Sequence, residues 1–185
     1  MDALELLHMR VSSPRLVGEV DKVKLDNILR AALRAPDHAQ LRPWRFLTID
    51  GESRQKLGTL FARAKLKEEP SISTVALEKI KKKPLRAPLV VVAITRICSH
   101  PKVPEVEQTL SMGAAVQSML LAAYAQGVGA MWRSGSMAFS EVVHQGLGLE
   151  ANESIAGFVY LGEPEGNMKS VKPLPISEFV QKWTD

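Results

Sequence analysis

The spacing of apolar residues predicts alternating helices and strands along the chain. Leucine and isoleucine recur at helical spacing between residues 21 and 34, and Pro36 ends that helix. Residues 44–49 alternate with period two before an Asp50-Gly51 turn, which is typical of a strand. Residues 87–94 are continuously apolar and rich in valine, as in a strand covered on both faces. These patterns predict an α+β domain.

The other segments complete this prediction. We expect helices at 2–9, after Ser53, at 73–83, at 107–126 and after Ser140, and strands at 131–134 and 155–161. Proline and glycine are frequent after residue 162, which indicates an extended C-terminal tail over 163–185. The apolar Phe179 and Trp183 in this tail suit contact with a neighbouring subunit. We therefore expect one domain over 1–185 that ends in this tail.

Composition narrows the class of protein. Hydrophobic residues make up 45% and charged residues 24% of the 185 residues, as in ordinary globular proteins. No apolar run approaches the roughly 20 residues of a membrane span, and the N-terminus lacks the basic start of a secretory signal. The single cysteine, Cys98, cannot form an internal disulfide, so we expect a cytoplasmic location. A nucleotide cofactor suffices to explain the net charge of +4.

No standard catalytic motif is present. The chain has no nucleophile elbow, no P-loop and no glycine-rich fingerprint after a strand. Its four histidines do not lie at metal-ligand spacing, so we expect no zinc site. An enzyme without its own acid-base machinery would take its chemistry from a cofactor.

Three segments could bind such a cofactor. In residues 9–15, two arginines and two serines could clamp a phosphate, or the segment is an ordinary helix end. Residues 34–46 form either a rigid polar binding loop or a plain connection that places Trp44 in the core. The glycines of residues 127–135 allow a planar ligand to approach the backbone, or they end a helix before a strand.

A run of lysines at 79–83 offers a different hypothesis, a nucleic-acid-binding surface. The run is short and has no aromatic residues beside it, and lysines are favourable at the C-terminus of a helix. We interpret it as the solvated end of a helix. Cys98 is interpreted as a small apolar residue at the end of a strand.

Taken together and in this order, these segments resemble the nitroreductase family, and most closely its small YdjA-like NAD(P)H nitroreductase subgroup. The similarity lies in Arg10-x-Ser12, in Ala35-Pro36-Asp37-His38 with Pro43-Trp44-x-Phe46, in Gly127-x-Gly129-x-x-Trp132-Arg133-Ser134-Gly135, and in Gly157 to Pro164. It covers nearly the whole chain.

The resemblance implies a three-layer α/β/α fold with a mixed, mostly antiparallel central sheet, in an intertwined homodimer that binds FMN at the subunit interface. It implies an oxidoreductase that passes hydride from NADH or NADPH through the flavin to nitroaromatics or quinones, by ping-pong kinetics. The residues that it places at FMN are Arg10, Val11, Ser12, Met131, Trp132 and Arg133, with Arg34 and His38 from the other subunit. At the nicotinamide nucleotide it places Leu121, Ala122, Ala123, Tyr124, Ala125 and Gln126. An apolar helix of this kind is more simply explained as part of the core.

Three positions depart from the family pattern. Val11 stands where relatives usually carry a second arginine, and Gln40 and Arg42 stand where asparagine and glutamine are common. Three arginines, Arg34, Arg42 and Arg133, are candidates for stabilising a reduced, anionic flavin. Two alternatives remain open: a flavin-binding protein with slow or no turnover, and another flavin chemistry on the same fold, such as dehalogenation or flavin fragmentation.

Overall fold

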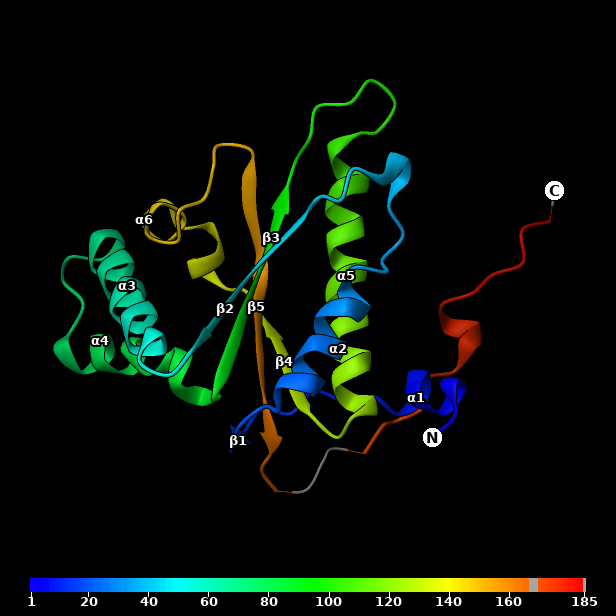
Figure 1. Ribbon diagram of the computed structural model, residues 1–185, viewed down its shortest axis with the longest axis horizontal. Helices are drawn as coiled ribbons and strands as arrows, with labels where there is room; N and C mark the ends of the chain where they lie inside the picture. Colours follow the sequence, from blue (N-terminus) through cyan, green and yellow to red (C-terminus); the bar gives the residue numbers. More distant parts are fainter. Residues whose placement is uncertain (167–169, 185) are drawn as a thin grey trace.

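A central antiparallel sheet divides the molecule into three layers (Figure 1). The computed structural model describes residues 1–166 and 170–184. Within these residues the sheet runs in the order β1-β5-β3-β2, and β4 also pairs with β5. Every pairing in it is antiparallel. The strands are β1 (Leu16–Val17), β2 (Trp44–Asp50), β3 (Leu89–Arg96), β4 (Gly129–Arg133) and β5 (Glu153–Pro164).

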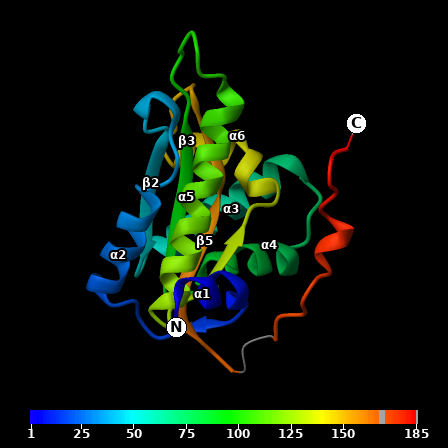
Figure 2. The same ribbon diagram turned by 90° about the vertical axis from the view of Figure 1, so that its right-hand side faces the viewer.

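Helices cover both faces of this sheet (Figures 1 and 2). One face carries α3 (Ser53–Glu68), α4 (Thr74–Lys81) and α6 (Glu141–Gly146), and the other carries α2 (Lys22–Ala32) and α5 (Glu105–Ala125). The short α1 (Ala3–Met9) packs against α5. This arrangement confirms the predicted α+β class. Short 3-10 turns lie at η1 (His38–Gln40), η2 (Lys83–Arg86), η3 (Ser136–Phe139) and η4 (Ile176–Glu178).

The central strand β3 contributes side chains to two separate hydrophobic cores, one on each face of the sheet. Its residues from Leu89 to Thr95 are all buried, and successive side chains point to opposite faces. Val90 and Val92 join the core beneath α3, where Phe61 meets Phe158 edge to face with 5.2 Å between the ring centres. Val91 joins the core beneath α5. The prediction of a strand covered on both faces is thereby confirmed.

Local sequence sets the start of three helices. The side chains of Asp2, Asp21 and Ser73 accept hydrogen bonds from the first turns of α1, α2 and α4, as N-caps do. Ser140 precedes α6 as expected, although its side chain makes no capping bond. No sequence pattern predicted β1, because two residues are too few to show a period.

The C-terminal tail begins later than its sequence indicated. Strand β5 continues through Glu163 and Pro164, so these residues belong to the sheet. Residues 170–184 are exposed throughout and contain a single 3-10 turn, and they extend away from the body (Figure 1). Positions 167–169 and 185 of the expected tail lie outside the described residues. Within the described part of the chain, no helix has the length and apolar character to cross a membrane.

A partly buried ion pair joins the edge strand β2 to β5. The guanidinium of Arg45 donates from Nε to Glu153 Oε1 at 2.7 Å and from Nη2 to Oε2 at 2.6 Å. The backbone N–H of Glu150 donates to the same carboxylate at 3.0 Å, and the Glu153 side chain is only 1% exposed. The Arg45 hydrogen bonds, together with that backbone N–H, hold the pKa of Glu153 below its usual range.

Replacing Glu153 by glutamine should therefore destabilise the fold by about 2 kcal/mol at pH 7, because Arg45 loses its charge-assisted hydrogen bonds. A carboxyl group with a lowered folded-state pKa contributes stability that is present above its unfolded pKa, and this stability is lost as the pH falls through the folded value. The difference between wild type and Glu153→Gln should shrink on acidification. Urea unfolding at pH 7 and below pH 4 measures it, with the exposed Glu150→Gln as control. A difference that does not change with pH would contradict this account.

Candidate functional site

The loop after α1 is fastened directly to strand β4. The backbone N–H of Ser13 donates to the carbonyl of Ala130 at 2.9 Å. Gly129 makes this approach possible, because a Cβ there would lie 3.1 Å from the Ser13 Cβ and 2.5 Å from Leu16 Cδ2. The structure therefore brings together two segments that lie far apart in the sequence, Arg10 to Ser13 and Gly129 to Arg133. Arg10, Val11 and Ser12 are all half-buried at this junction.

A cationic pocket of about 220 Å³ lies where β4 ends. Lys83, Arg86 and Arg133 bring three positive charges to it, and none of the described residues that line it is acidic. Neither Lys83 nor Arg86 forms an ion pair with a described residue. We call this the β4 pocket. Its remaining lining residues are Phe61, Ser134, Gly135, Ser136, Met137, Phe158 and Tyr160.

Arg133 is the residue in this pocket that most requires a ligand. Its Nε is buried and has no hydrogen-bond partner among the described residues. Its guanidinium lies over the ring of Tyr160, 5.6 Å from the ring centre. Burial raises the pKa of Tyr160, and the charges of Arg133 and Arg86 oppose that rise. A buried donor without an acceptor costs about 1–3 kcal/mol, so an acceptor or anion at this point would stabilise the site.

The size of the β4 pocket limits what one chain can enclose. A cavity of about 150 Å³ can hold a benzene ring, and pockets for drug-sized ligands measure roughly 300–1,000 Å³. The 220 Å³ available here would take one ring of a larger planar molecule. The rest of that molecule would need walls from outside this chain.

The side chain of Trp132 leaves β4 on the face opposite to Arg133, because successive residues of a strand alternate. Ladder β3–β5 has a bulge at this point, which leaves Ala156 out of register. The indole N–H of Trp132 donates to the Ala156 carbonyl at 3.2 Å, and the ring lies against Gly157. Met131, the remaining predicted residue of this strand, packs on the core beneath α3.

The second predicted segment lies at the other end of α5. His38 Nδ1 is 2.7 Å from Glu107 Oε2 in the first turns of that helix. They lie in a pocket of about 330 Å³ with Pro36, Asp37, Leu110, Ser111 and Ala114. The 21 residues of α5 span roughly 30 Å, and β4 begins beyond its far end. One chain therefore does not bring His38 to Arg10, and Arg34, at the end of α2, is exposed.

Backbone strain is concentrated in the loop that carries His38. Ala39, Gln40 and Arg42 have φ values of 59°, 54° and 51°, in the left-handed region that costs residues other than glycine about 1–3 kcal/mol each. Asp37 Oδ2 accepts a hydrogen bond from the Arg42 backbone N–H at 2.7 Å and closes the loop. The side chains of Gln40 and Arg42 are exposed.

Trp44, which follows this loop, packs against the core beneath α5 as expected. Its indole N–H donates to Ser111 Oγ at 3.1 Å, and Ser111 in turn donates to the carbonyl of Pro36 at 2.6 Å. These bonds fix both ends of the strained loop to α5.

Residues 121–126 form the last turn of α5 and its C-cap. Ala123 is fully buried. The Gln126 side chain donates to the carbonyls of Ala122 at 2.9 Å and Lys24 at 3.3 Å, and it accepts from Asn27 Nδ2 at 3.0 Å. The side-chain amide of Gln126 therefore links α5 to α2.

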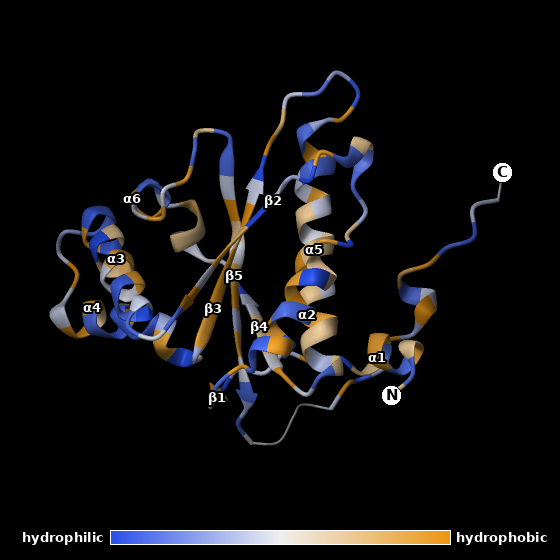
Figure 3. Ribbon diagram, viewed as in Figure 1, coloured by the Kyte–Doolittle hydropathy of each residue, from blue (hydrophilic) through white to orange (hydrophobic). Residues whose placement is uncertain are grey.

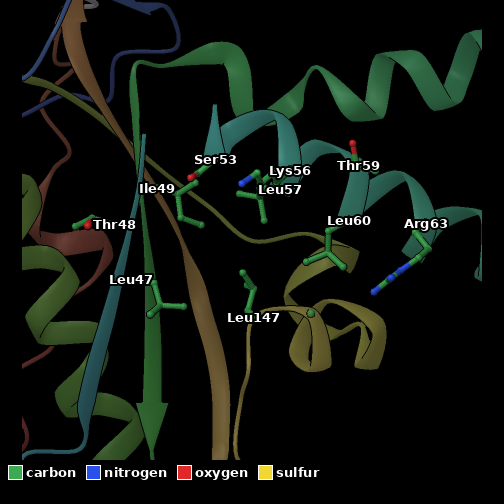
Figure 4. A pocket seen from close by; sticks show the side chains of 11 residues that line it. Leu47, Thr48, Ile49, Ser53, Lys56, Leu57, Thr59, Leu60, Arg63 and Leu147 are labelled. Atoms are coloured by element: carbon green, nitrogen blue, oxygen red, sulfur yellow. The ribbon is translucent and has the colours of Figure 1, made fainter. Parts of the chain in front are cut away.

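A larger cavity of about 560 Å³ contains none of the residues that the sequence singled out. It lies between β2, α3 and the residues that follow α6 (Figure 4). Leu47, Leu57, Leu60 and Leu147 make it apolar, and Lys56 and Arg63 stand at its rim. The described residues contain no group of three histidine, cysteine, aspartate or glutamate side chains that could hold a metal ion.

Sequence reasoning missed two cations of the β4 pocket. The sequence places Lys83 at the solvated end of a helix. In the structure α4 ends at Lys81, which pairs with Glu78 at 2.6 Å. Lys83 starts the next turn, η2, and faces the pocket with Arg86. Pro84 is the available signal, since a proline disfavours the helical conformation of the residue before it and so indicates that Lys83 lies beyond the helix.

Comparison with known proteins agrees with this architecture. The family model described as "Nitroreductase family" matches residues 18–163. The Escherichia coli (strain K12) protein named "Putative NAD(P)H nitroreductase YdjA" is 40% identical over 166 residues, which cover 89% of this chain and 90% of that protein. A Haemophilus influenzae protein named "Putative NAD(P)H nitroreductase" is 35% identical over 164 residues, or 88% of each chain.

Solved structures share the fold. A nitroreductase-like family protein from Bacillus cereus superposes with a TM-score of 0.84 at 23% identity, covering 98% of this chain and 96% of that one. A Desulfovibrio desulfuricans structure, described as a putative nitroreductase in complex with FMN, has a TM-score of 0.75 at 25% identity and the same coverage. The three-layer architecture is that of the nitroreductase-like proteins. This chain belongs to the nitroreductase family.

The position of Trp132 can be tested through Gly157. A Cβ at residue 157 would overlap the Trp132 ring, so Gly157→Ala should displace the indole and cost about 1–3 kcal/mol of stability. Urea unfolding and tryptophan fluorescence measure the two effects. Gly113→Ala is the control, because nothing lies within 4 Å of its added Cβ. Unchanged fluorescence and stability in Gly157→Ala would show that the indole does not lie there.

Proposed function

We propose that this protein is an FMN-dependent oxidoreductase that passes hydride from NADH or NADPH to electron-poor acceptors such as nitroaromatics or quinones. It acts as a homodimer with FMN at the subunit interface. The observation that carries this proposal is the β4 pocket, in which three cations, and an Arg133 Nε that no described residue satisfies, could bind a planar or anionic group.

The residues present fit a flavin mononucleotide. Arg10 and Ser12, held beside β4 by the Ser13–Ala130 hydrogen bond, would bind the phosphate and the ribityl chain. Arg133 and the backbone of β4 near Met131 and Trp132 would line the ring. When bound, FMN would accept hydride from the nicotinamide and pass two electrons to the acceptor.

The positive charge of the β4 pocket is what this chain would contribute to the reaction at the flavin. Lys83, Arg86 and Arg133 would stabilise negative charge on a reduced flavin, because a partly buried site screens charge less than water does. Arg34 and Arg42, the other arginines that the sequence offered for this role, lie outside the pocket and are exposed. Within one chain, Arg133 is therefore the arginine of the three that lines the pocket.

Exposed apolar side chains support the dimer. Leu4 on α1, Leu110 on α5 and Trp183 in the tail are 66%, 67% and 88% exposed in one chain. Apolar residues are visible along α1 and the tail in Figure 3. Large exposed apolar patches mark protein interfaces, and we propose that these residues belong to one. A second copy that covered it would also bring its own His38 loop towards the β4 pocket and supply the missing walls.

The proposal is tested first on purified protein. We expect a yellow solution whose flavin absorbance bleaches with NADPH and returns when a quinone or nitroaromatic is added. NAD(P)H oxidation that is fast with an acceptor, and slow without one, identifies a reductase rather than a flavin-binding protein with little turnover. A colourless protein that cannot be reconstituted with FMN would rule out the proposal.

Arg10→Ala should weaken FMN binding by about 1.5–3 kcal/mol, the usual value of a charge-assisted contact. Quenching of flavin fluorescence measures the affinity. Arg30→Ala, an exposed arginine of α2, is the matched control and should bind FMN as wild type does. Equal affinities in the two variants would reject Arg10 as a phosphate ligand.

Replacing Phe179 and Trp183 together by serine should shift the protein from dimer to monomer, because both side chains are exposed in one chain and would lose their partner surface. Light scattering after size-exclusion chromatography measures the mass. The control replaces their polar neighbours Gln181 and Lys182 by serine and should remain dimeric. A double variant that stays dimeric would show that the tail does not contribute to the dimer interface.

A further inference from the structure

The His38–Glu107 pair carries an inference that rests on the proposed function and extends it. His38 Nδ1 and Glu107 Oε2 are 2.7 Å apart, and the pair joins a loop to a helix 69 positions away in sequence. An ionised carboxylate can only accept a hydrogen bond, so the imidazole must carry its hydrogen on Nδ1. The nitrogen left for any further partner is Nε2.

The loop around His38 is built to hold that ring in one place. Asp37 closes it through the Arg42 backbone N–H, and Ser111 holds the carbonyl of Pro36. Three residues of the loop keep left-handed backbone conformations that none of them prefers. Strain that the surroundings maintain in this way is typical of ligand-contacting segments.

The pair also lies on the face that we assign to the second subunit. The His38 and Glu107 side chains are 55% and 43% exposed in one chain, and their pocket is lined by Leu110. Leu110 and its neighbour on the helix Val106 are 67% and 62% exposed. A second copy seated on these residues would close the pocket and place its own cofactor near His38 Nε2.

We propose that Glu107 is a positioning residue, which fixes the tautomer and orientation of His38 so that Nε2 contacts the FMN bound by the partner subunit. Glu107 itself does not touch the cofactor. It acts through His38 alone, as a carboxylate does when it orients a histidine that binds a metal. No pattern around residue 107 marks it for this role in the sequence.

The first test reads the tautomer directly. Nitrogen-15 chemical shifts of the His38 ring, recorded at alkaline pH, should show hydrogen on Nδ1 in the wild type. Glutamine at 107 can donate as well as accept, so Glu107→Gln should allow the Nε2–H tautomer. The matched control is Glu105→Gln, an exposed residue of the same helix turn, which should leave the spectrum unchanged. An unchanged tautomer in Glu107→Gln would overturn the inference.

The second test separates positioning from general stability. Glu107→Gln should weaken FMN binding roughly fivefold, the equivalent of one hydrogen bond. In a His38→Ala background the same change should have no further effect, because Glu107 acts only through His38. A loss of equal size in both backgrounds, or no loss in either, would reject the positioning role. Wild-type protein that binds no FMN would instead refute the proposed function itself.

Discussion

The ladder between β3 and β5 is the constraint on which the rest of the molecule depends. It runs from Leu89 opposite Leu161 to Arg96 opposite Glu153 and is buried on both faces for most of its length. Because side chains alternate along each strand, this one pairing anchors two cores, one beneath α3 and one beneath α5. It also gives β5 a free edge on which β4 can pair.

Strand β4 carries the residues of the candidate site on this sheet. It ends next to η2 and the aromatic side chains beneath α3, so Arg133 meets Lys83 and Arg86 without any neutralising acid among the lining residues. Such a concentration of like charge is unfavourable in an isolated chain and becomes favourable when an electron-rich ligand binds. The same argument accounts for the buried Nε of Arg133 that no described residue satisfies.

The two halves of the candidate site lie at opposite ends of α5, and several apolar residues of the single chain are exposed. A helix of 21 residues is too long for the His38 loop and the Arg10 loop of one chain to meet on one ligand. Two copies packed along α5 would bring one loop of each to the same cofactor. The subunit interface and the cofactor site would then be a single structure, and loss of one would weaken the other.

The sequence by itself determined most of the helices and strands, and that β3 is covered on both faces. Helical spacing and the valine run of β3 act over a few neighbouring residues, so they can be read without the fold. The motifs also located the Arg10 loop and the Trp132-Arg133 strand. Only the tertiary structure decided that Lys83 belongs to a pocket rather than to a solvated helix end, that Glu107 holds His38, and that the Trp132 indole donates to the Ala156 carbonyl. These contacts join residues tens of positions apart, and local patterns carry no information about which distant side chains the sheet brings together.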